Sequence, residues 1–264
     1  MMRIPTTKRL EEITSQLEKK GYVKAKELSK QYEVSMETIR KDLTYLEEKG
    51  IAKKEYGGAS LSPLSIERSI EFRKNKYDEK KEIAQYAVKL LKDYHVMILD
   101  SGSTCQACVP YINRMPQMDI ITNSIACFEQ LNGDIHNVFL TGGKKREKNL
   151  SMIGNWTEQF IKHIHADICF LGTSGILDSL GPTAHSYQEL TTKKLMIERS
   201  DLVFILADSS KFQEKGIHTV ANWDQIDGII TDHNLSIKIY EEMNKKVPIY
   251  IVDELEEGNL ILLD

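Results

Sequence analysis

Five short segments rich in Ser, Thr, Gly and Asn follow predicted buried strands, and their chemistry suits an anion. Residues 100–104 read Asp-Ser-Gly-Ser-Thr, directly after the apolar run 96–99 and directly before a helical pattern. Small residues at such a junction expose backbone N–H groups, hydroxyls and a helix N-terminus, which together attract a phosphate. The sequence therefore predicts an anion site at residues 100–104.

The other four segments, residues 122–124, 141–143, 172–175 and 208–211, stand at the same kind of junction. Lys211 is a candidate ligand for a phosphate or a carbonyl oxygen, and Asp208 for a sugar hydroxyl. Because open α/β sheets bind ligands outside the carboxyl ends of their strands, the five segments predict one shared crevice. With no Lys-Ser pair of a P-loop in them, they favour a small polyhydroxylated phosphate over a nucleotide.

Three further groups of reactive side chains fit ordinary structural roles at least as well as chemistry. Cys105 and Cys108 form a Cys-x-x-Cys pair at a helix start, where packing is favoured and redox sensing is the alternative. His163, His165 and Cys169 have no second ligand pair at zinc spacing, so we expect no metal. Residues 144–146 (Lys-Lys-Arg) are an anion clamp or a solvated loop.

A second set of polar residues, near the N-terminus, suits nucleic acid. Ser35 is placed as an N-cap, and an apolar stripe of Ile39, Leu43 and Leu46 follows at helical spacing. The opposite, exposed side of this helix carries Glu37, Thr38, Arg40 and Lys41. In a helix-turn-helix the corresponding residues face base edges, where Arg can bind guanine, while Lys can neutralise a phosphate.

Three predicted helices and a β-ribbon must position this helix, which makes residues 1–59 a winged helix-turn-helix domain. Lys53, Lys54 and the Gly57-Gly58 tip are then placed along the DNA backbone or the minor groove. Residues 60–76 are predicted to be a linker. The first 60 residues carry a net charge of +3 and the remaining residues −7, as expected if one end contacts nucleic acid.

Residues 77–264 are predicted to be an α/β domain for effector sensing and oligomerisation. Apolar runs alternate there with helical patterns, which indicates a mostly parallel sheet covered on both faces. The runs are 96–99, 120–121, 138–140, 168–171, 203–206, 229–230 and 249–252. No stretch approaches 18 apolar residues, the N-terminus has no apolar signal region, and four cysteines form no disulfide framework, so we expect a cytoplasmic protein without membrane contact.

The segment VSMETIRKDLTYLEEKG, followed by KEYGGAS, resembles the N-terminal signature of the DeoR family of bacterial transcriptional regulators. Lys41 replaces a common arginine of that signature and Tyr56 a common histidine, which suggests an altered operator preference. The motifs DSGST, ITNS, LTGG, FLGTSGI, LADSSKF and IITD are similar to the family's effector domain, whose fold is that of ribose-5-phosphate isomerase. The resemblance spans residues 8–232.

The resemblance implies a repressor of a sugar operon that a phosphorylated sugar releases from double-stranded operator DNA, acting as a dimer or a larger even-numbered homo-oligomer without a further cofactor. Segment 184–194 is the least standard part and a candidate determinant of effector identity. The predicted DNA-contacting residues are Ser35, Glu37, Thr38, Arg40, Lys41, Lys53, Lys54, Tyr56, Gly57 and Gly58. The predicted effector residues are Asp100, Ser101, Gly102, Ser103, Thr104, Thr122, Asn123, Ser124, Gly142, Gly143, Gly172, Ser174, Gly175, Asp208 and Lys211.

The alternative is a sugar-phosphate isomerase with a DNA-binding appendage. Such an enzyme needs a carboxylate that moves a proton between adjacent carbons. The loop after residues 168–171 reads GTSGI and has no acid before Asp178. Related isomerases carry acidic residues in that loop, so we expect a protein that binds its ligand without turning it over.

Overall fold

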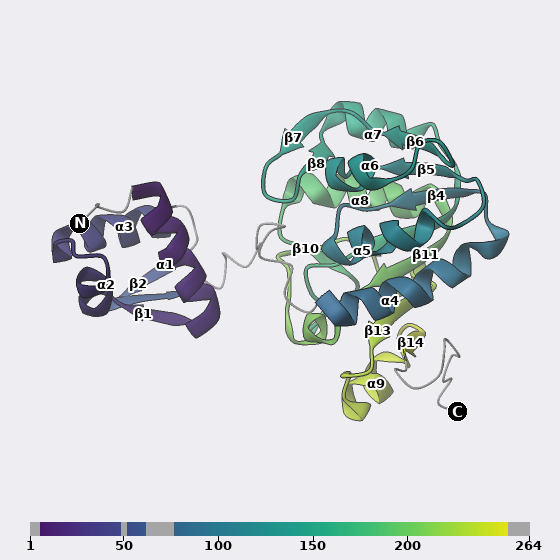
Figure 1. The fold of residues 1–264 in the computed structure, drawn as a ribbon. Helices are drawn as coiled ribbons and strands as arrows, with labels where there is room; N and C mark the ends of the chain where they lie inside the picture. The colour runs from purple at the N-terminus through teal and green to yellow at the C-terminus, as the bar shows by residue number, and fades with distance from the viewer. Residues whose placement is uncertain (1–5, 49–51, 62–76, 253–264) are drawn as a thin grey trace. The chain divides into compact units, whose positions relative to one another are not determined.

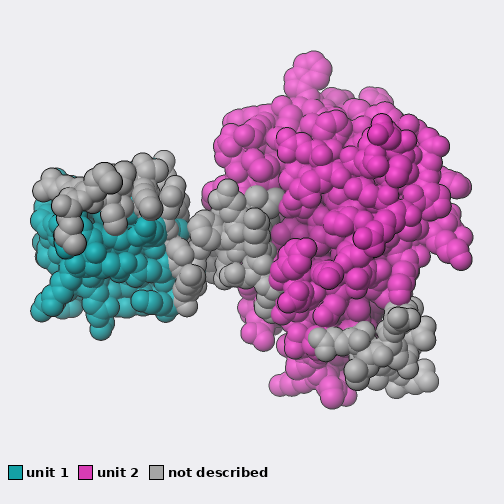
Figure 2. All heavy atoms as spheres, viewed as in Figure 1, with its two compact units in different colours: residues 1–68 teal, residues 69–264 magenta. Residues whose placement is uncertain are grey.

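The computed structural model describes residues 6–48, 52–61 and 77–252. The chain divides into two compact units, residues 1–68 and 69–264, which Figure 2 shows in separate colours. All but the first two residues of the predicted linker, residues 62–76, lie outside the described residues. Among the helices that are described, none is both long and apolar enough to cross a membrane.

The first unit holds three helices and a three-stranded antiparallel sheet (Figure 1). The sequence-predicted helices and ribbon are confirmed, and the extended residues after the first helix add a strand that pairs with the last one. The elements are α1 (Thr6–Lys20), β1 (Tyr22–Lys24), α2 (Ala25–Gln31), α3 (Met36–Glu48), β2 (Ala52–Glu55) and β3 (Gly58–Leu61).

A small apolar core and one buried ion pair hold the first unit together. Ile13, Leu17 and Ile39 are fully buried between the helices. Arg9 of α1 donates to both carboxylate oxygens of Asp42 on α3, at 2.7 and 3.1 Å, and both side chains are 7% exposed. Asp42, for which no structural role was predicted, lies beside the predicted DNA-contacting residues and anchors their helix to α1.

The second unit is built on a seven-stranded parallel sheet with the strand order β14-β13-β11-β9-β4-β5-β6 (Figure 1). All seven apolar runs predicted to be strands lie within it. The strands are β4 (Val96–Leu99), β5 (Asp119–Thr122), β6 (Asn137–Leu140), β9 (Ala166–Gly172), β11 (Ser200–Leu206), β13 (Gly228–Asp232) and β14 (Ile249–Val252). The parallel α/β architecture expected from the sequence is confirmed.

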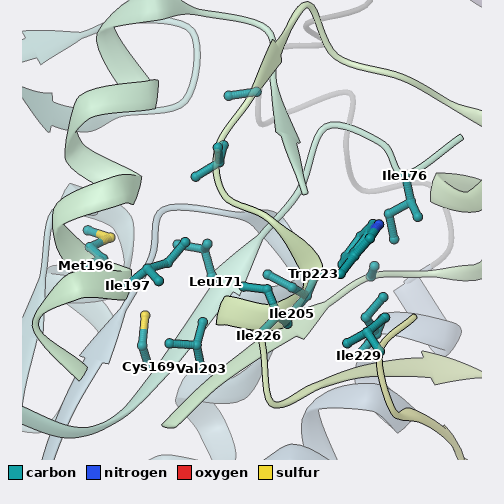
Figure 3. Packing of buried hydrophobic residues seen from close by; sticks show 14 of the residues in the cluster. Cys169, Leu171, Ile176, Met196, Ile197, Val203, Ile205, Trp223, Ile226 and Ile229 are labelled. Carbon is teal, nitrogen blue, oxygen red and sulfur yellow. The ribbon is translucent and has the colours of Figure 1, made fainter. Parts of the chain in front are cut away.

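Helices cover both faces of this sheet and give it two cores. Residues of α4 (Tyr77–Lys89) and α5 (Ser103–Ile112) pack on one face, with α6 (Ile125–Gln130) beside α5. Residues of α7 (Asn155–Lys162), α8 (Tyr187–Glu198) and α9 (Ile237–Met243) pack on the other face. Figure 3 shows part of this second core, where Cys169 of β9 lies close to Met196 and Ile197 of α8, and Ile205 of β11 lies nearer to Trp223 and Ile226.

Two short antiparallel ribbons were not predicted, because each strand has only two or three residues and carries little apolar patterning. They are β7 (Lys144–Arg146) with β8 (Ser151–Ile153), and β10 (Thr183–Ala184) with β12 (His218–Thr219). The first ribbon bonds to the segment after β5, since Met152 N donates to Asn123 O and Ile125 N to Leu150 O. It therefore lies against the carboxyl edge of the sheet, where the candidate site is.

Candidate functional site

The strands β4 and β9 are neighbours in the sheet although paired residues such as Leu99 and Phe170 are 71 positions apart in the chain, and they mark the point where the strand order reverses. From β4 the chain builds the sheet outward through β5 to β6, and from β9 it builds the other way through β11, β13 and β14. In open α/β sheets such a point is where ligands bind. Asp100 follows β4 here and Gly172 ends β9, so two predicted segments meet at this position.

A buried ion pair occupies the centre of this edge. Lys193 of α8 pairs with Asp100 and also donates to Gly172 O at 2.8 Å, while Gly172 N donates to Asp100 Oδ2 at 3.0 Å. Burial acts to lower the pKa of Lys193, but the nearby carboxylates of Asp100 and Glu189 outweigh it and raise that pKa above its ordinary value. Lys193 is thus held in its charged form at the reversal point of the sheet, where Asp100 balances its charge.

A chain of polar side chains extends from this pair across the edge. Asn149 Nδ2 donates to Ser101 Oγ at 3.1 Å and to Glu189 Oε1 at 2.7 Å. Arg146 donates to Asn149 Oδ1 at 3.0 Å, and its guanidinium lies 3.6 Å from Glu189. Ser151 donates to the same oxygen of Asn149 at 2.8 Å. The ribbon β7–β8 and helix α8 thereby supply a second cation, Arg146, close to the predicted phosphate loop.

The loops after β5 and β6 contribute both fixed and unpartnered groups. Thr122 Oγ1 donates to Leu99 O and accepts from Ser124 N, while Ser124 Oγ accepts from Cys127 N at the start of α6, so these two predicted effector residues make structural bonds. Asn123 Oδ1 and Thr141 Oγ1 are buried and have no hydrogen-bond partner among the described residues. Such groups cost free energy unless a ligand or water satisfies them.

Three glycines, Gly143 after β6, Gly102 after β4 and Gly172 at the end of β9, allow close packing at this edge. A Cβ atom on Gly143, whose φ is 117°, would contact Ile153 O and Thr157 Oγ1. Gly102 and Gly172 approach each other so closely that a Cβ on either would lie 3.3 Å from the other's Cα. Glycine at 102 and 172 therefore allows the loop after β4 to pack on the end of β9.

Thr183 connects the loops after β9 and β11 by hydrogen bonds, and the second of these loops begins with a turn. Thr183 Oγ1 donates to Gly175 O at 2.6 Å and accepts from Gly216 N at 2.7 Å. Asp208 Oδ1 accepts from Ser210 N, which starts a single 3-10 turn. The ammonium of Lys211 pairs with Glu214, three residues along the chain, and its contact with an effector remains a prediction.

Sequence reasoning missed Lys193, Glu189 and Asn149, and it left Arg146 undecided between a clamp and a solvated loop. Glu189 and Lys193 are four residues apart, so they lie on one face of α8, and both are buried although charged residues are usually exposed. That spacing was the available signal. Both residues fall in segment 184–194, which was identified as the least standard part of the chain.

The candidate nucleic-acid surface of the first unit is centred on α3. Ser35 caps this helix, since Thr38 N donates to Ser35 Oγ at 3.1 Å. The side chains of Glu37, Arg40 and Lys41 are exposed, and Arg40 lies 3.9 Å from Glu37. An exposed guanidinium near the N-terminus of a capped helix can reach the base edges of a major groove.

The ribbon β2–β3 forms the wing beside α3. Lys53, Lys54 and Tyr56 are exposed, and Tyr56 stands fully out of the surface at the tip. Lys54 Nζ also donates to Thr44 Oγ1 of α3 at 2.9 Å, which fixes the wing to the helix. Gly57 has a φ of 82°, and a Cβ on Gly58 would overlap Val23 O of β1, so both positions require glycine.

The four cysteines behave as core residues. All four are free and buried, and burial raises the pKa of the Cys105, Cys108 and Cys169 thiols well above the ordinary value and that of Cys127 to about 12. A thiol that resists ionisation is a poor nucleophile. The structure supports the packing interpretation of Cys105 and Cys108. Cys169 lies in the core while His163 and His165 are exposed, and the described residues hold no group of side chains that suits a metal.

We expect Ellman's reagent to label none of the four cysteines in the native protein within minutes. All four should react once the chain is unfolded in guanidinium, because burial and not oxidation protects them. Absorbance of the released thiolate at neutral pH provides the measurement. Rapid labelling of one or two thiols in the native state would restore the redox interpretation of the Cys-x-x-Cys pair.

Models of two protein families match the chain. Residues 9–63 match the DeoR-like helix-turn-helix domain, and residues 75–233 match the DeoR C terminal sensor domain. The two matches fall on the two units of the structure.

Curated relatives match nearly the whole chain. A protein of Escherichia coli O157:H7, named as a candidate aga operon transcriptional repressor, is 32% identical over 94% of this chain and 95% of its own length. The lactose phosphotransferase system repressor of Staphylococcus epidermidis is 32% identical over 86% of this chain and 92% of its own. The glycerol-3-phosphate regulon repressor of Escherichia coli K12 is 29% identical over 86% and 90%. Among solved structures, ribose 5-phosphate isomerase A of Methanocaldococcus jannaschii covers 52% of this chain and 55% of its own, with 18% identity and a TM-score of 0.38.

Proposed function

Because the chain belongs to the DeoR family of DNA-binding transcriptional regulators, we propose that it represses an operon for sugar or carbohydrate use and leaves its operator when a phosphorylated sugar binds the second unit. It is a regulator and not an enzyme, so the isomerase alternative is not favoured. The proposal includes a cytoplasmic location, which binding to operator DNA would require.

The observation that carries the effector assignment is the pair of cations beside the loop at residues 100–104. Lys193 and Arg146 are both anchored by carboxylates at the carboxyl edge of the sheet, where the N-terminus of α5 adds backbone N–H groups. With these N–H groups, the two cations would bind a phosphate that shares them with the carboxylates of Asp100 and Glu189. The unpartnered Asn123 Oδ1 and Thr141 Oγ1 are suited to the hydroxyls of a sugar. No metal or further cofactor is part of the proposal.

The test is fluorescence anisotropy on a duplex from upstream of this protein's own reading frame, at one fixed salt concentration and against scrambled DNA. A panel of sugar phosphates and the matching unphosphorylated sugars is then added. We expect specific binding that one phosphate reverses and that its parent sugar does not. Equal release by the parent sugar would contradict the phosphate assignment, and equal affinity for scrambled DNA would contradict the operator assignment.

Arg40→Ala should weaken operator binding by about 1–3 kcal/mol, because a guanidinium that contacts a guanine base is lost. The affinity for scrambled DNA should fall less, since that binding depends mostly on phosphates. Lys162→Ala, which removes an exposed cation from α7 in the second unit, is the matched control and should leave both affinities unchanged. If Arg40→Ala lowers the affinities for operator and scrambled DNA by the same factor, Arg40 makes no base contact.

Ser103→Asp should leave operator affinity intact and raise the effector concentration needed for release by at least about tenfold, or 1.4 kcal/mol. Ser103 is the first residue of α5, where an aspartate suits the helix dipole but repels a bound phosphate. Asn155→Asp places the same charge at the exposed first residue of α7 and serves as the control. An unchanged release curve for Ser103→Asp would mean that the phosphate binds elsewhere.

A further inference from the structure

The strand β6 stands at one edge of the seven-stranded sheet, and its outer side faces no other strand in the described ranges (Figure 1). Asn137 N and Thr141 N donate inward to β5, at Met118 O and Thr122 O. Because backbone groups alternate in direction along a parallel strand, those of Val138 and Leu140 point outward from the sheet.

This edge strand is only four residues long, but it lacks two other features that usually protect an edge. Residues 137–141 read Asn-Val-Phe-Leu-Thr, with neither a charge nor a proline. Phe139 is 44% exposed, and Phe128 and Ile135 nearby along the chain are also exposed. Thr157 at the start of α7 donates to Gly142 O, which brings the neighbouring and largely exposed Trp156 close to the end of the strand. An apolar edge of this kind favours pairing with another strand.

We infer that β6 pairs with β6 of a second copy of this chain, in antiparallel orientation, and joins two sheets across a two-fold axis. The outward groups of Val138 then exchange hydrogen bonds with those of Leu140 in the partner, twice by symmetry. Phe139 faces its own counterpart in a non-hydrogen-bonded pair, where side chains approach closely. The surface is self-complementary, as a two-fold interface requires.

The charges at the two ends of β6 support this partner. Asp119 and Asp134 lie at the N-terminal end, where Asn137 donates to Asp119 Oδ1 at 2.7 Å. Lys144 and Lys145 follow the C-terminal end and are exposed, and Lys145 also pairs with Glu147 of its own chain at 3.0 Å. Antiparallel pairing brings the acidic end of one copy to the basic end of the other. A helix-turn-helix protein needs two DNA-binding units to occupy two half-sites, which agrees with a second copy. Only this last argument rests on the proposed function.

The decisive experiment is a cysteine substitution at the two-fold axis of the full chain, without DNA. A non-hydrogen-bonded pair places its Cα atoms about 4.5 Å apart, within disulfide range. We expect Phe139→Cys to form a disulfide-linked dimer under mild oxidation at micromolar concentration, since the native cysteines are buried. Lys162→Cys, on the exposed side of α7, is the control and should remain a monomer on a non-reducing gel. A Phe139→Cys chain that links no better than the control overturns the inference.

Charge reversal tests the orientation with variants that leave the core untouched. Lys144→Glu should weaken self-association about tenfold, and adding Asp134→Lys to the same chain should restore it, because opposite charges meet again. Analytical ultracentrifugation of the two variants and the parent chain gives the dissociation constants. A parent chain that is monomeric throughout, or a double variant that associates more weakly than Lys144→Glu alone, overturns the pairing even if operator binding is confirmed.

Discussion

Lys193→Met should destabilise the second unit by about 3–5 kcal/mol, because it leaves the buried carboxylate of Asp100 without its counterion. Methionine has nearly the length of lysine and fills the same space, so the loss is electrostatic more than steric. Urea unfolding followed by the fluorescence of Trp223, which is buried in the core of this unit, measures the change. The exposed Lys194→Met on the same helix is the matched control and should cost less than about 0.5 kcal/mol.

The loss of unfolding free energy in Lys193→Met should depend on pH, and the direction of this dependence identifies its cause. An unpaired buried carboxyl has a folded-state pKa above its unfolded one, so the folded variant binds more protons and its loss of stability grows as pH rises. We therefore expect the deficit to shrink toward about pH 4, near the ordinary pKa of Asp. In the parent chain the raised pKa of Lys193 keeps this side chain charged at neutral pH, so the ion pair with Asp100 stabilises the fold there. This stabilisation is lost only as pH rises above about 10. A deficit independent of pH would point to packing instead.

Arg9→Met should have an effect of similar size on the first unit, about 3–5 kcal/mol, because Asp42 then lies buried without its bidentate partner. A unit of some 60 residues has a small free energy of unfolding, so this change should unfold the first unit at physiological temperature. Operator binding should disappear although Arg9 touches no DNA in the proposed arrangement. Thermal unfolding by circular dichroism should show an early transition, while effector binding to the second unit persists.

The double variant Arg9→Met with Asp42→Leu distinguishes a lost ion pair from a lost contact. Replacing both members of a buried pair by apolar residues is often nearly neutral. We expect the double variant to recover most of the stability of the first unit and much of its operator binding. If it is no more stable than Arg9→Met, the geometry of the bidentate contact, and not charge compensation, holds α1 on α3.

The sequence predicted the parts of the molecule whose signals are local. The N-cap at Ser35, the apolar stripe of α3 and the seven strands of the parallel sheet each depend on residues within one short segment. The convergence of five loops on one edge followed from the rule for parallel strands.

What could not be predicted depends on residues far apart in the chain. Lys193 and Asp100 are 93 residues apart, and Arg9 and Asp42 are 33 apart. No periodicity connects such pairs, and charged residues are taken as exposed by default. The assumption that charged residues are exposed is correct for Arg40 and Lys41, but it is wrong for Asp42 next to them, which is buried. Thr122 and Ser124 were predicted to contact the effector, which stays a prediction, and their bonds to the backbone were not predicted, because a hydroxyl after a strand suits either role.

The long separation of Asp100 and Lys193 also bears on biosynthesis. While the chain is being made, β4 to β6 leave the ribosome well before β9 and α8, so the proposed sensing site is among the last parts that can assemble. A chain that stops before α8 lacks both Glu189 and Lys193 and has no complete site. An effector that binds only the finished edge also stabilises it by mass action, by about 2.7 kcal/mol at one hundred times its dissociation constant. The metabolite that switches the regulator would therefore protect newly made copies from degradation.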